Sequence, residues 1–319
     1  MIHENNIVAG VDVGGTTVKI GFFTPAGDKL HAFEIPTRTE DTGVHVLPDI
    51  AEAIRREISA CGHSYEDLAG VGLDVPGPVD TQGIIHGAVN IGWGKFSIKD
   101  EMEALVGVPV AAGNDATIAA LGEVWKGCAQ GCDDFLLLTL GTGIGGGIVA
   151  GGHIIAGATG AGGEIGHFHL EDTDENCSCG CNGCFEQFCS ATGFVRITKK
   201  LLAEKTDASV LRDQAFDSKE IFAAAAAGDA MADEAIHLYG DYLGRGIAVL
   251  CSILNPKIVA LGGGVSKAGT QLIDLLRPSF EAHTFHASRH VDFRIATLGN
   301  DAGMYGSAKL ILDALATNG

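Results

Sequence analysis

The chain has 319 residues, 46% of them hydrophobic, and a net charge of −19 from 21 basic and 40 acidic residues. This length suits two lobes of ordinary domain size, and the apolar content excludes a disordered chain. The acidic balance argues against nucleic acid or an anionic membrane as partner, because both are bound through clusters of Lys and Arg.

The N-terminal part predicts strands in a hairpin, followed by strands that alternate with helices. Ile7–Val13 and Thr16–Phe23 are β-branched runs around a Gly14-Gly15 turn, and His31–Ile35 extends them. Further along the chain, we expect strands over Leu68–Val75 and Val108–Ala112 and helices over Val44–Cys61, Ile98–Val106 and Ala116–Lys126. This order is typical of the α/β class.

A similar order begins again after Trp125. Phe135–Leu140 and Gly145–Ala150 predict two strands around a glycine turn, so the sequence indicates a weak internal repeat and two related lobes. The elements expected after this second hairpin are helices over Gly193–Ala203, Ser218–Ala227, Met231–Leu254 and Gly303–Ala316 and a strand over Lys257–Leu261.

Targeting and membrane segments are not expected. The residues before Ile7 are polar and lack the pattern of a signal peptide, and the most apolar stretches, Phe135–Leu140 and Ile247–Leu261, are too short or too interrupted to cross a bilayer. Nine cysteines without an export signal favour reduced thiols and a metal over a disulfide framework. We therefore expect a cytoplasmic protein.

Two glycine turns are candidates for phosphate binding. Gly141-Thr142-Gly143-Ile144-Gly145-Gly146 matches G-x-G-x-x-G, but a strand follows it where a dinucleotide site needs a helix. Taken alone, this turn could equally be a plain tight turn. Its counterpart, Asp12-Val13-Gly14-Gly15-Thr16-Thr17, adds an aspartate that can hold Mg²⁺ through water, while the N–H groups and hydroxyls beyond it can meet phosphate oxygens.

Two other segments extend this interpretation. Gly262-Gly263-Gly264 follows a strand, and its lack of side chains would let a base or ribose pass close to the backbone. Asn114-Asp115 lies between a strand and a helix, at the strand end where α/β sheets bind ligands. By itself this pair would be an ordinary helix N-cap.

Potential metal ligands are most concentrated between Gly160 and Ser190, where five of the nine cysteines fall within thirteen residues. The spacing H-x9-C-x-C-x4-C selects His167, Cys177, Cys179 and Cys184 as four tetrahedral ligands. Three thiolates and one imidazole form a closed, soft site that suits structural zinc better than catalytic zinc. Cys181 is an alternative ligand, and Cys189 and His169 are expected to lie outside the site.

Six motifs together resemble the ROK family of sugar kinases, and within it the bacterial glucokinases, over nearly the whole chain. They are DVGGTTVK at Asp12–Lys19, VPGPVD at Val75–Asp80, NIGW at Asn90–Trp93, NDATIAALGE at Asn114–Glu123, LGTGIGGG at Leu140–Gly147 and E-x-G-H…C-x-C-G-x-x-G-C-x-E-x-x-x-S over Glu164–Ser190. The last motif is the most specific, because four ligand spacings and two glutamates must coincide. Gly262–Val265 and Asn300–Gly306 fit the same family.

The resemblance implies an α/β fold of the actin-like (ribonuclease H-like) type, in which ATP and sugar bind in a cleft between two lobes. It also implies a homodimer, the usual assembly in the family. A small N-terminal lobe would comprise residues 1–117 and the C-terminal helix 303–319. A large lobe would comprise residues 118–302 and contain a zinc-binding segment over 164–190.

The implied activity is a glucokinase that transfers the γ-phosphoryl group of ATP to the 6-hydroxyl of glucose, with Mg²⁺ and a structural Zn²⁺. Asp115 is implied as the catalytic base. The residues implied to bind sugar are Gly77, Asn90, Asn114, Asp115, Glu164, His167 and Glu186. Those implied to bind the nucleotide are Asp12, Gly14, Gly15, Thr16, Thr17, Lys19, Gly141, Thr142, Gly143, Gly262, Gly263 and Gly264.

The chain departs from the family pattern at Thr117, where Asn is common, and at Asp74, where a small residue is common. Ser190-Ala191-Thr192-Gly193 with Arg196 favours glucokinases over N-acetylhexosamine kinases. The alternatives are a kinase for N-acetylmannosamine, N-acetylglucosamine or another hexose, with ATP or polyphosphate as donor. A sugar-responsive transcriptional repressor is a third class, which the negative charge and the early first strand oppose.

Overall fold

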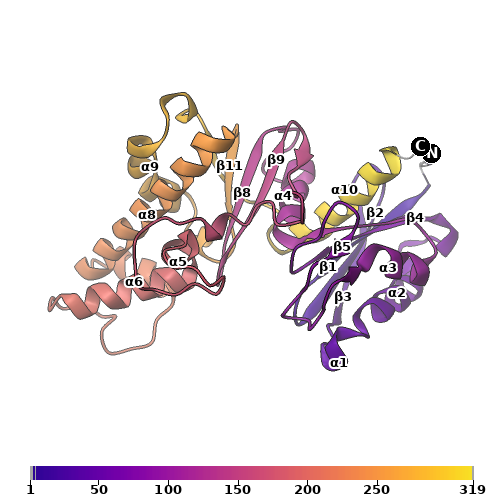
Figure 1. Cartoon of the computed structure of the whole chain (residues 1–319), viewed down its shortest axis with the longest axis horizontal. Helices are drawn as coiled ribbons and strands as arrows, with labels where there is room; N and C mark the ends of the chain where they lie inside the picture. The colour runs from indigo at the N-terminus through magenta and orange to yellow at the C-terminus, as the bar shows by residue number, and fades with distance from the viewer. Residues whose placement is uncertain (1–2, 4, 318–319) are drawn as a thin grey trace. The chain divides into compact units, whose positions relative to one another are not determined.

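The computed structural model describes residues 3 and 5–317. Contacts group these residues into two compact units (Figure 1). Unit 1 contains the chain up to Asp133, the segment Gly147–Gly163 and the chain from Leu298 on, and unit 2 contains Asp134–Gly146 and Glu164–Thr297. The lobe boundaries expected from the sequence stay a prediction.

Unit 1 is built on a five-stranded sheet in the order β3-β2-β1-β4-β7. The three N-terminal strands are antiparallel, and β4 and β7 then add in parallel to β1. The bounds are β1 (Ile7–Val13), β2 (Thr17–Phe23), β3 (Lys29–Pro36), β4 (Leu68–Val75) and β7 (Val110–Asn114). The hairpin predicted around Gly14-Gly15 is therefore confirmed.

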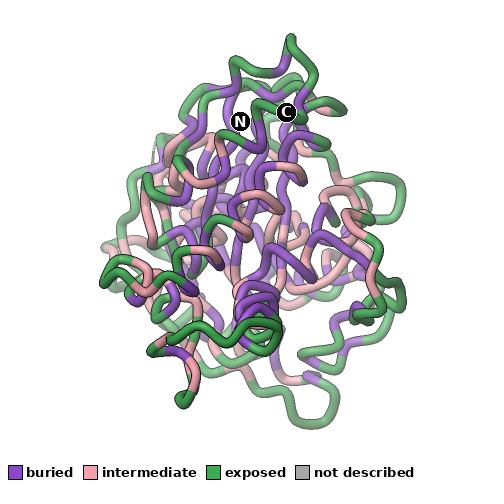
Figure 2. Tube along the Cα trace, turned by 90° about the vertical axis from the view of Figure 1, so that its left-hand side faces the viewer, coloured by how far each residue is buried: buried purple, intermediate pink, exposed green. Residues whose placement is uncertain are grey.

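Helices cover both faces of this sheet. The odd residues of β1, such as Ala9 and Val11, face a core shared with α2 (Val46–Glu57) and α3 (Ile98–Val106), whereas Val8 faces α10 (Ala302–Thr317). This alternation is the two-residue period of a strand buried on both faces. Figure 2 shows the buried residues along the interior elements and the exposed ones in the connecting loops.

Close backbone packing sets α10 against the sheet. A Cβ on Gly72 of β4 would overlap the carbonyl of Ser307 on α10, so only glycine allows this approach. α10 also packs against α4 (Asp115–Lys126). The short elements of this unit are α1 (Glu40–Gly43), β5 (Ile84–Ile85), β6 (Phe96–Ser97) and β10 (His153–Ile154).

The second sheet repeats the strand order of the first. Its order is β10-β9-β8-β11-β12, with β10 antiparallel to β9 and with β11 parallel to β8 and β12. The bounds are β8 (Phe135–Leu140), β9 (Ile144–Ala150), β11 (Ile258–Gly262) and β12 (Asp292–Ile295). In both sheets the first strand of the hairpin lies between its partner and a parallel strand, so the internal repeat indicated by the sequence is confirmed.

Apart from its strands, among them β8, β11 and β12, unit 2 is largely helical. α8 and α9 pack together along their lengths, and α5 and α6 pack against α8. The bounds are α5 (Phe185–Cys189), α6 (Ala191–Glu204), α7 (Ser218–Ala226), α8 (Ala230–Leu254) and α9 (Thr270–His283). Among the described residues, no helix combines the length and apolar character needed to cross a membrane.

The expected elements are present with small shifts in their bounds, whereas the short elements α1, β5, β6, β10 and α5, together with α9 and β12, were not predicted. The helix expected over Val44–Cys61 is shorter, because its last residues, Ile58–Cys61, form a 3-10 turn. α9 was not predicted because Pro278 interrupts its pattern, although its apolar face is buried. β12 was not predicted because its four residues are too few to show a period.

Candidate active site

The first glycine turn is braced by the end of β3. The N–H of Gly14 donates to the carbonyl of Thr17 at 3.1 Å, which closes the turn between β1 and β2. Thr37 clamps it from the side, because its hydroxyl donates to Gly14 O at 2.7 Å and its N–H donates to Thr16 O at 3.0 Å. Gly15 and Thr16 stay exposed at the tip, where their N–H groups can meet a ligand.

Lys19 is held near the C-terminal segment of unit 1. It pairs with Asp12 across the hairpin, and its ammonium donates to the carbonyl of Asn300 at 3.0 Å. Lys19 also lowers the pKa of Asp12, although burial, the larger effect, leaves that pKa above its ordinary value. The first turn thus carries one cation beside one half-buried carboxyl group.

Asp12 lies beside a second carboxyl group, that of Asp74, and the two groups influence each other's pKa. The two residues are register partners on the parallel strands β1 and β4, and Asp74 is fully buried. Ser307 of α10 donates to Asp74 Oδ2 at 3.0 Å. Burial, and then the negative charges of Asp12 and Asp115, raise the pKa of Asp74 well above 3.8. Burial and neighbouring negative charge both favour the neutral form of a carboxyl group, so Asp74 is the member of the pair that retains a proton.

This pair predicts a pH dependence of stability. In the window above pH 3.8 and below the raised folded pKa, the folded state binds a proton at Asp74 that the unfolded state has lost. The free energy of unfolding must therefore fall as the pH rises through this window. Asp74→Asn removes the titration, so its stability relative to wild type should increase with pH, by about 1.4 kcal/mol for each unit of pKa shift.

The measurement is denaturant unfolding of wild type and Asp74→Asn between pH 4 and pH 8, with exposed Asp213→Asn as control. A stability difference that stays constant with pH would show that Asp74 is ionised in the folded protein.

The turn from β7 into α4 presents the predicted base. Asn114 caps the helix, because its Oδ1 accepts from the N–H of Thr117 at 3.2 Å. Its Nδ2 donates to Gly77 O at 3.2 Å, which ties the cap to the Pro-Gly-Pro segment after β4. Asp115 is the first residue of α4 and is exposed. Both expectations for this pair therefore hold at once: Asn114 is a helix cap, and it places Asp115 at a strand end.

Asn90 lies on a tight turn next to the first glycine turn. Paired backbone bonds between Ala88 and Trp93, at 3.0 and 3.1 Å, close the turn and leave Asn90 exposed. A Cβ added to Gly15 would lie 3.8 Å from the Asn90 Cβ. Unit 1 thus brings Asn90 next to the first glycine turn.

In unit 2, the four predicted metal ligands converge. One ligand atom from each of His167, Cys177, Cys179 and Cys184 lies within 4.8 Å of every other. His167 Nδ1 is 3.5 Å from Cys177 Sγ, and the Sγ atoms of Cys179 and Cys184 are 3.6 Å apart. Tetrahedral zinc with bonds of about 2.0–2.3 Å requires ligand separations of about 3.5–3.8 Å. The donor set and its spacing therefore fit Zn²⁺.

The neighbouring cysteines lie outside this cluster. Cys181 is exposed, and its carbonyl accepts from the N–H of Cys177 at 2.8 Å, so the backbone rather than the thiol shapes the loop. Cys189 is buried in α5, and its carbonyl accepts from Tyr239 Oη at 2.8 Å. His169 is exposed and contacts Asp172 and the Asn182 carbonyl, each at 3.1 Å.

The predicted sugar residues Glu164 and His167 lie side by side. His167 Nδ1 faces Cys177, while its Nε2 lies 3.9 Å from Glu164 Oε2. One ring nitrogen is therefore available to a metal, and the other points toward a carboxylate and away from the thiols. This arrangement would fix the tautomer of His167 when a metal is bound.

Glu186 has a structural link that the sequence analysis missed. Its Oε2 accepts from the N–H of Ile144 at 2.8 Å, directly after the second glycine turn. Ala191 N donates to Gly141 O at 2.8 Å, and the Thr192 hydroxyl donates to Thr142 O at 2.7 Å. The segment after the cysteines therefore braces the second glycine turn, as Thr37 braces the first. The sequence indicated the turn at Gly141–Gly143 but not its contact with Glu186, because no spacing rule connects residues that lie so far apart in the chain.

Gly262, Gly263 and Gly264 end β11 in unit 2. Gly263 has a φ of +81°, and a Cβ there would lie 2.6 Å from the Leu140 carbonyl oxygen, immediately before the second glycine turn. Gly264 has open space around its Cβ direction. The structure thus brings together Asp12, Lys19, Gly77, Asn90, Asn114 and Asp115 within unit 1 and Gly141–Gly143, Glu164, His167, Glu186 and Gly262–Gly264 within unit 2.

Comparison with known proteins identifies the family to which the chain belongs. A family model described as the ROK family matches residues 8–314. A glucokinase of Halalkalibacterium halodurans is 44% identical over 309 residues, which are 95% of this chain and 94% of that protein. The α/β fold with two lobes of the actin-like type is thereby confirmed.

Two solved structures extend the similarity over nearly the full length. The ROK hexokinase of Thermus thermophilus is 33% identical in sequence, and its structure matches with a TM-score of 0.83. The match covers 98% of this chain and 100% of that chain. A ROK family glucokinase of Streptomyces griseus, solved with glucose and AMPPNP, is 33% identical with a TM-score of 0.74 over 96% and 99% of the two chains.

Proposed function

The chain belongs to the ROK family, and we propose that it is a glucokinase that transfers the γ-phosphoryl group of ATP to the 6-hydroxyl of glucose. The observation that carries this proposal is Asp115, exposed at the start of α4 and set by the Asn114 cap at a strand end. The glucokinase from Halalkalibacterium halodurans and the glucose complex from Streptomyces griseus support the choice of sugar.

Asp115 would orient the sugar hydroxyl and accept its proton as the O–P bond forms. Phosphoryl transfer needs little covalent chemistry from the protein, since positioning and charge neutralisation lower most of the barrier. One carboxylate within hydrogen-bond reach of the hydroxyl is sufficient as base. Asn114 would contribute by fixing the helix start, because both polar ends of its side chain are engaged with the backbone.

The phosphates would be held mainly by backbone groups. The N–H groups of Gly15 and Thr16 are exposed, and the second turn, Gly141–Gly143, is braced by residues 186–192. Mg²⁺ would supply charge neutralisation, and the carboxylate of Asp12, at the end of β1, offers the kind of oxygen donor that this hard cation prefers. This arrangement would let a strongly acidic chain bind an anionic nucleotide.

Zinc would have a structural role in this proposal. His167, Cys177, Cys179 and Cys184 would hold it, and the loop so fixed would place Glu164 and His167 for sugar hydroxyls. Glu186 would serve both sugar and nucleotide, because its carboxylate also accepts from Ile144 N. The expected homodimer stays a prediction.

The proposal is tested by the ratio of kcat/KM values over a panel of acceptors: glucose, mannose, N-acetylglucosamine and N-acetylmannosamine. Glucose should give the highest value with ATP and Mg²⁺, and inorganic polyphosphate should be the poorer donor. Preference for an N-acetylhexosamine would keep the kinase but overturn its substrate.

A substitution in the second glycine turn should affect nucleotide and sugar together. A Cβ on Gly143 would overlap Glu186 Oε2, so Gly143→Ala must displace that carboxylate from Ile144 N. We expect KM for both ATP and glucose to rise, each by roughly tenfold, which corresponds to about 1.4 kcal/mol. The matched control is Gly151→Ala in the following turn, which has open space for a Cβ although its φ is +56°. A rise in KM for ATP alone would contradict the dual role of Glu186.

A further inference from the structure

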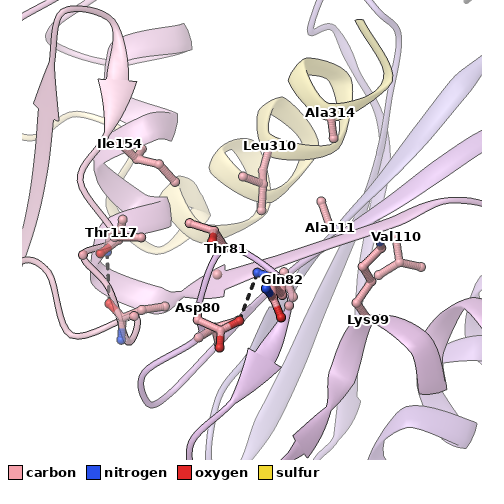
Figure 3. A pocket seen from close by; sticks show the side chains of 18 of the residues that line it. Asp80, Thr81, Gln82, Lys99, Val110, Ala111, Thr117, Ile154, Leu310 and Ala314 are labelled. Carbon is pink, nitrogen blue, oxygen red and sulfur yellow. Dashed lines mark hydrogen bonds between the residues drawn. The ribbon is translucent and has the colours of Figure 1, made fainter. Parts of the chain in front are cut away.

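Unit 1 contains a cavity of about 550 Å³ beside α4, lined mainly by aliphatic side chains of β7, α10 and the loop after β10. Figure 3 shows Thr117 on one side of it and Lys99 on the other. Its two charged lining residues are engaged within the protein. Lys99 lies 3.9 Å from a carboxylate oxygen of Glu103, and Asp80 lies 3.0 Å from a ring nitrogen of His86. In unit 2, by contrast, one arginine bears directly on the proposed sugar and phosphate contacts.

Arg196, in the second turn of α6, fastens the end of α5. Its guanidinium donates to two oxygens of Gln187, the backbone carbonyl and the side-chain Oε1. Gln187 is 9% exposed, so water has little access to replace these bonds. Gly193 allows the two helices to approach, because a Cβ there would lie 2.5 Å from the same carbonyl oxygen. A planar guanidinium suits this contact with two oxygens better than the ammonium of lysine does.

This contact determines the surroundings of Glu186, the residue before Gln187. The carboxylate of Glu186 accepts from Ile144 N at 2.8 Å, directly after the second glycine turn, and its carbonyl accepts from Ser190 N at 3.1 Å. A helix of five residues such as α5 has few hydrogen bonds of its own. Its position therefore depends on outside contacts, and Arg196 supplies two that are charge-assisted.

The other contact of Arg196 is weaker. Its Nε lies 3.8 Å from Glu175 Oε2 in the cysteine segment, and the Glu175 side chain is 50% exposed. Water and salt screen an ion pair of this kind, which contributes little to stability. The bonds to Gln187, and not the ion pair, should therefore determine what the arginine does.

We propose that Arg196 is a positioning residue for the second glycine turn and for the sugar site. By holding Gln187, it keeps the Glu186 carboxylate against Ile144 N. The inference rests on the proposed function, in which Glu186 contacts sugar and Gly141–Gly143 contacts phosphate. Arg196 itself needs no contact with either substrate.

Arg196→Met keeps most of the aliphatic stem and removes the donors. KM for ATP and KM for glucose should each rise about tenfold, the effect of losing a charge-assisted hydrogen bond, while kcat stays within a few-fold of wild type. Zinc content should stay at the wild-type value. Arg196→Lys should recover only part of the affinity. Glu175→Gln should change each KM by less than about twofold, and Lys200→Met, exposed on the same helix, should match wild type.

A double-mutant cycle with Glu186→Ala separates positioning from a general loss of stability. Without the carboxylate, Arg196 has nothing to position, so adding Arg196→Met to Glu186→Ala should weaken ATP affinity by less than about twofold. Equal effects with and without the Glu186 carboxylate would overturn the proposal, as would wild-type KM values in Arg196→Met. Arg196→Lys, which keeps the charge, serves in the same cycle if Arg196→Met does not fold.

The same cycle, measured as the Kd of a non-hydrolysable ATP analogue without sugar, distinguishes this inference from the proposed function. A chain that binds the analogue but does not phosphorylate glucose would contradict the glucokinase proposal, while the Kd values would still decide the role of Arg196. A Kd that is unchanged by Arg196→Met in an active glucokinase would contradict the positioning role alone.

Discussion

Asp115→Ala and Asp115→Asn should each lower kcat for glucose phosphorylation by about 10²–10⁴-fold, the usual contribution of a general base. Asparagine keeps the shape of the side chain and can still accept from the N–H of Ala116, which donates to Asp115 Oδ1 at 2.8 Å. The loss in this variant would therefore come from the missing base and not from a disturbed helix start. Glucose affinity, measured by titration without turnover, should stay within a few-fold of wild type.

The control for this prediction is Asp213→Asn, an exposed aspartate outside the candidate site. It should leave kcat and KM unchanged. Turnover in Asp115→Asn within a factor of ten of wild type would remove Asp115 as the base. A large rise in the glucose Kd, with little change in kcat, would instead make it a sugar-binding residue.

Cys179→Ala should release zinc and weaken both the fold and the sugar site. Loss of one of four ligands leaves three donors, and binding of structural zinc is coupled to folding free energy. We expect the zinc content, measured by mass spectrometry of the purified protein, to fall well below one ion per chain. The unfolding temperature should fall with it, and KM for glucose should rise by roughly tenfold or more as Glu164 and His167 lose their support.

Cys181→Ala is the matched control, since Cys181 is exposed like Cys179 and lies two residues away, outside the ligand cluster. It should keep its zinc, its stability and its glucose kinetics. If Cys179→Ala loses zinc while glucose kinetics stay unchanged, the cysteine loop stabilises the fold but does not position the sugar-binding residues. If Cys181→Ala loses zinc as well, the ligand set is wrong.

The sequence predicted the parts of the site that depend on local pattern. These parts are the two glycine hairpins, the Asn114 cap and the four metal ligands. Each lies within a short segment, where the spacing of residues along the chain largely determines their positions relative to one another. Residue periodicity also located most of the helices and strands. The second sheet repeats the strand order of the first, which the paired glycine turns had indicated.

Contacts between distant segments could not be predicted. The bond from Ile144 N to Glu186 spans 42 residues, and the Asp12–Asp74 pair depends on the register of two parallel strands. The cavity beside Thr117 likewise depends on how β7, α10 and the loop after β10 pack. α9 shows the limit of local rules, because its buried face compensates for a proline that propensity alone would treat as a break.

The most direct test of the proposed function is to identify the product formed from ¹³C-labelled glucose, ATP and Mg²⁺. Nuclear magnetic resonance should show phosphorus coupling at carbon 6 of glucose, with one ADP released for each phosphorylated sugar and almost no product from Asp115→Asn. Release of ADP without phosphorylated glucose, or a phosphoryl group on another hydroxyl, would contradict the proposed reaction.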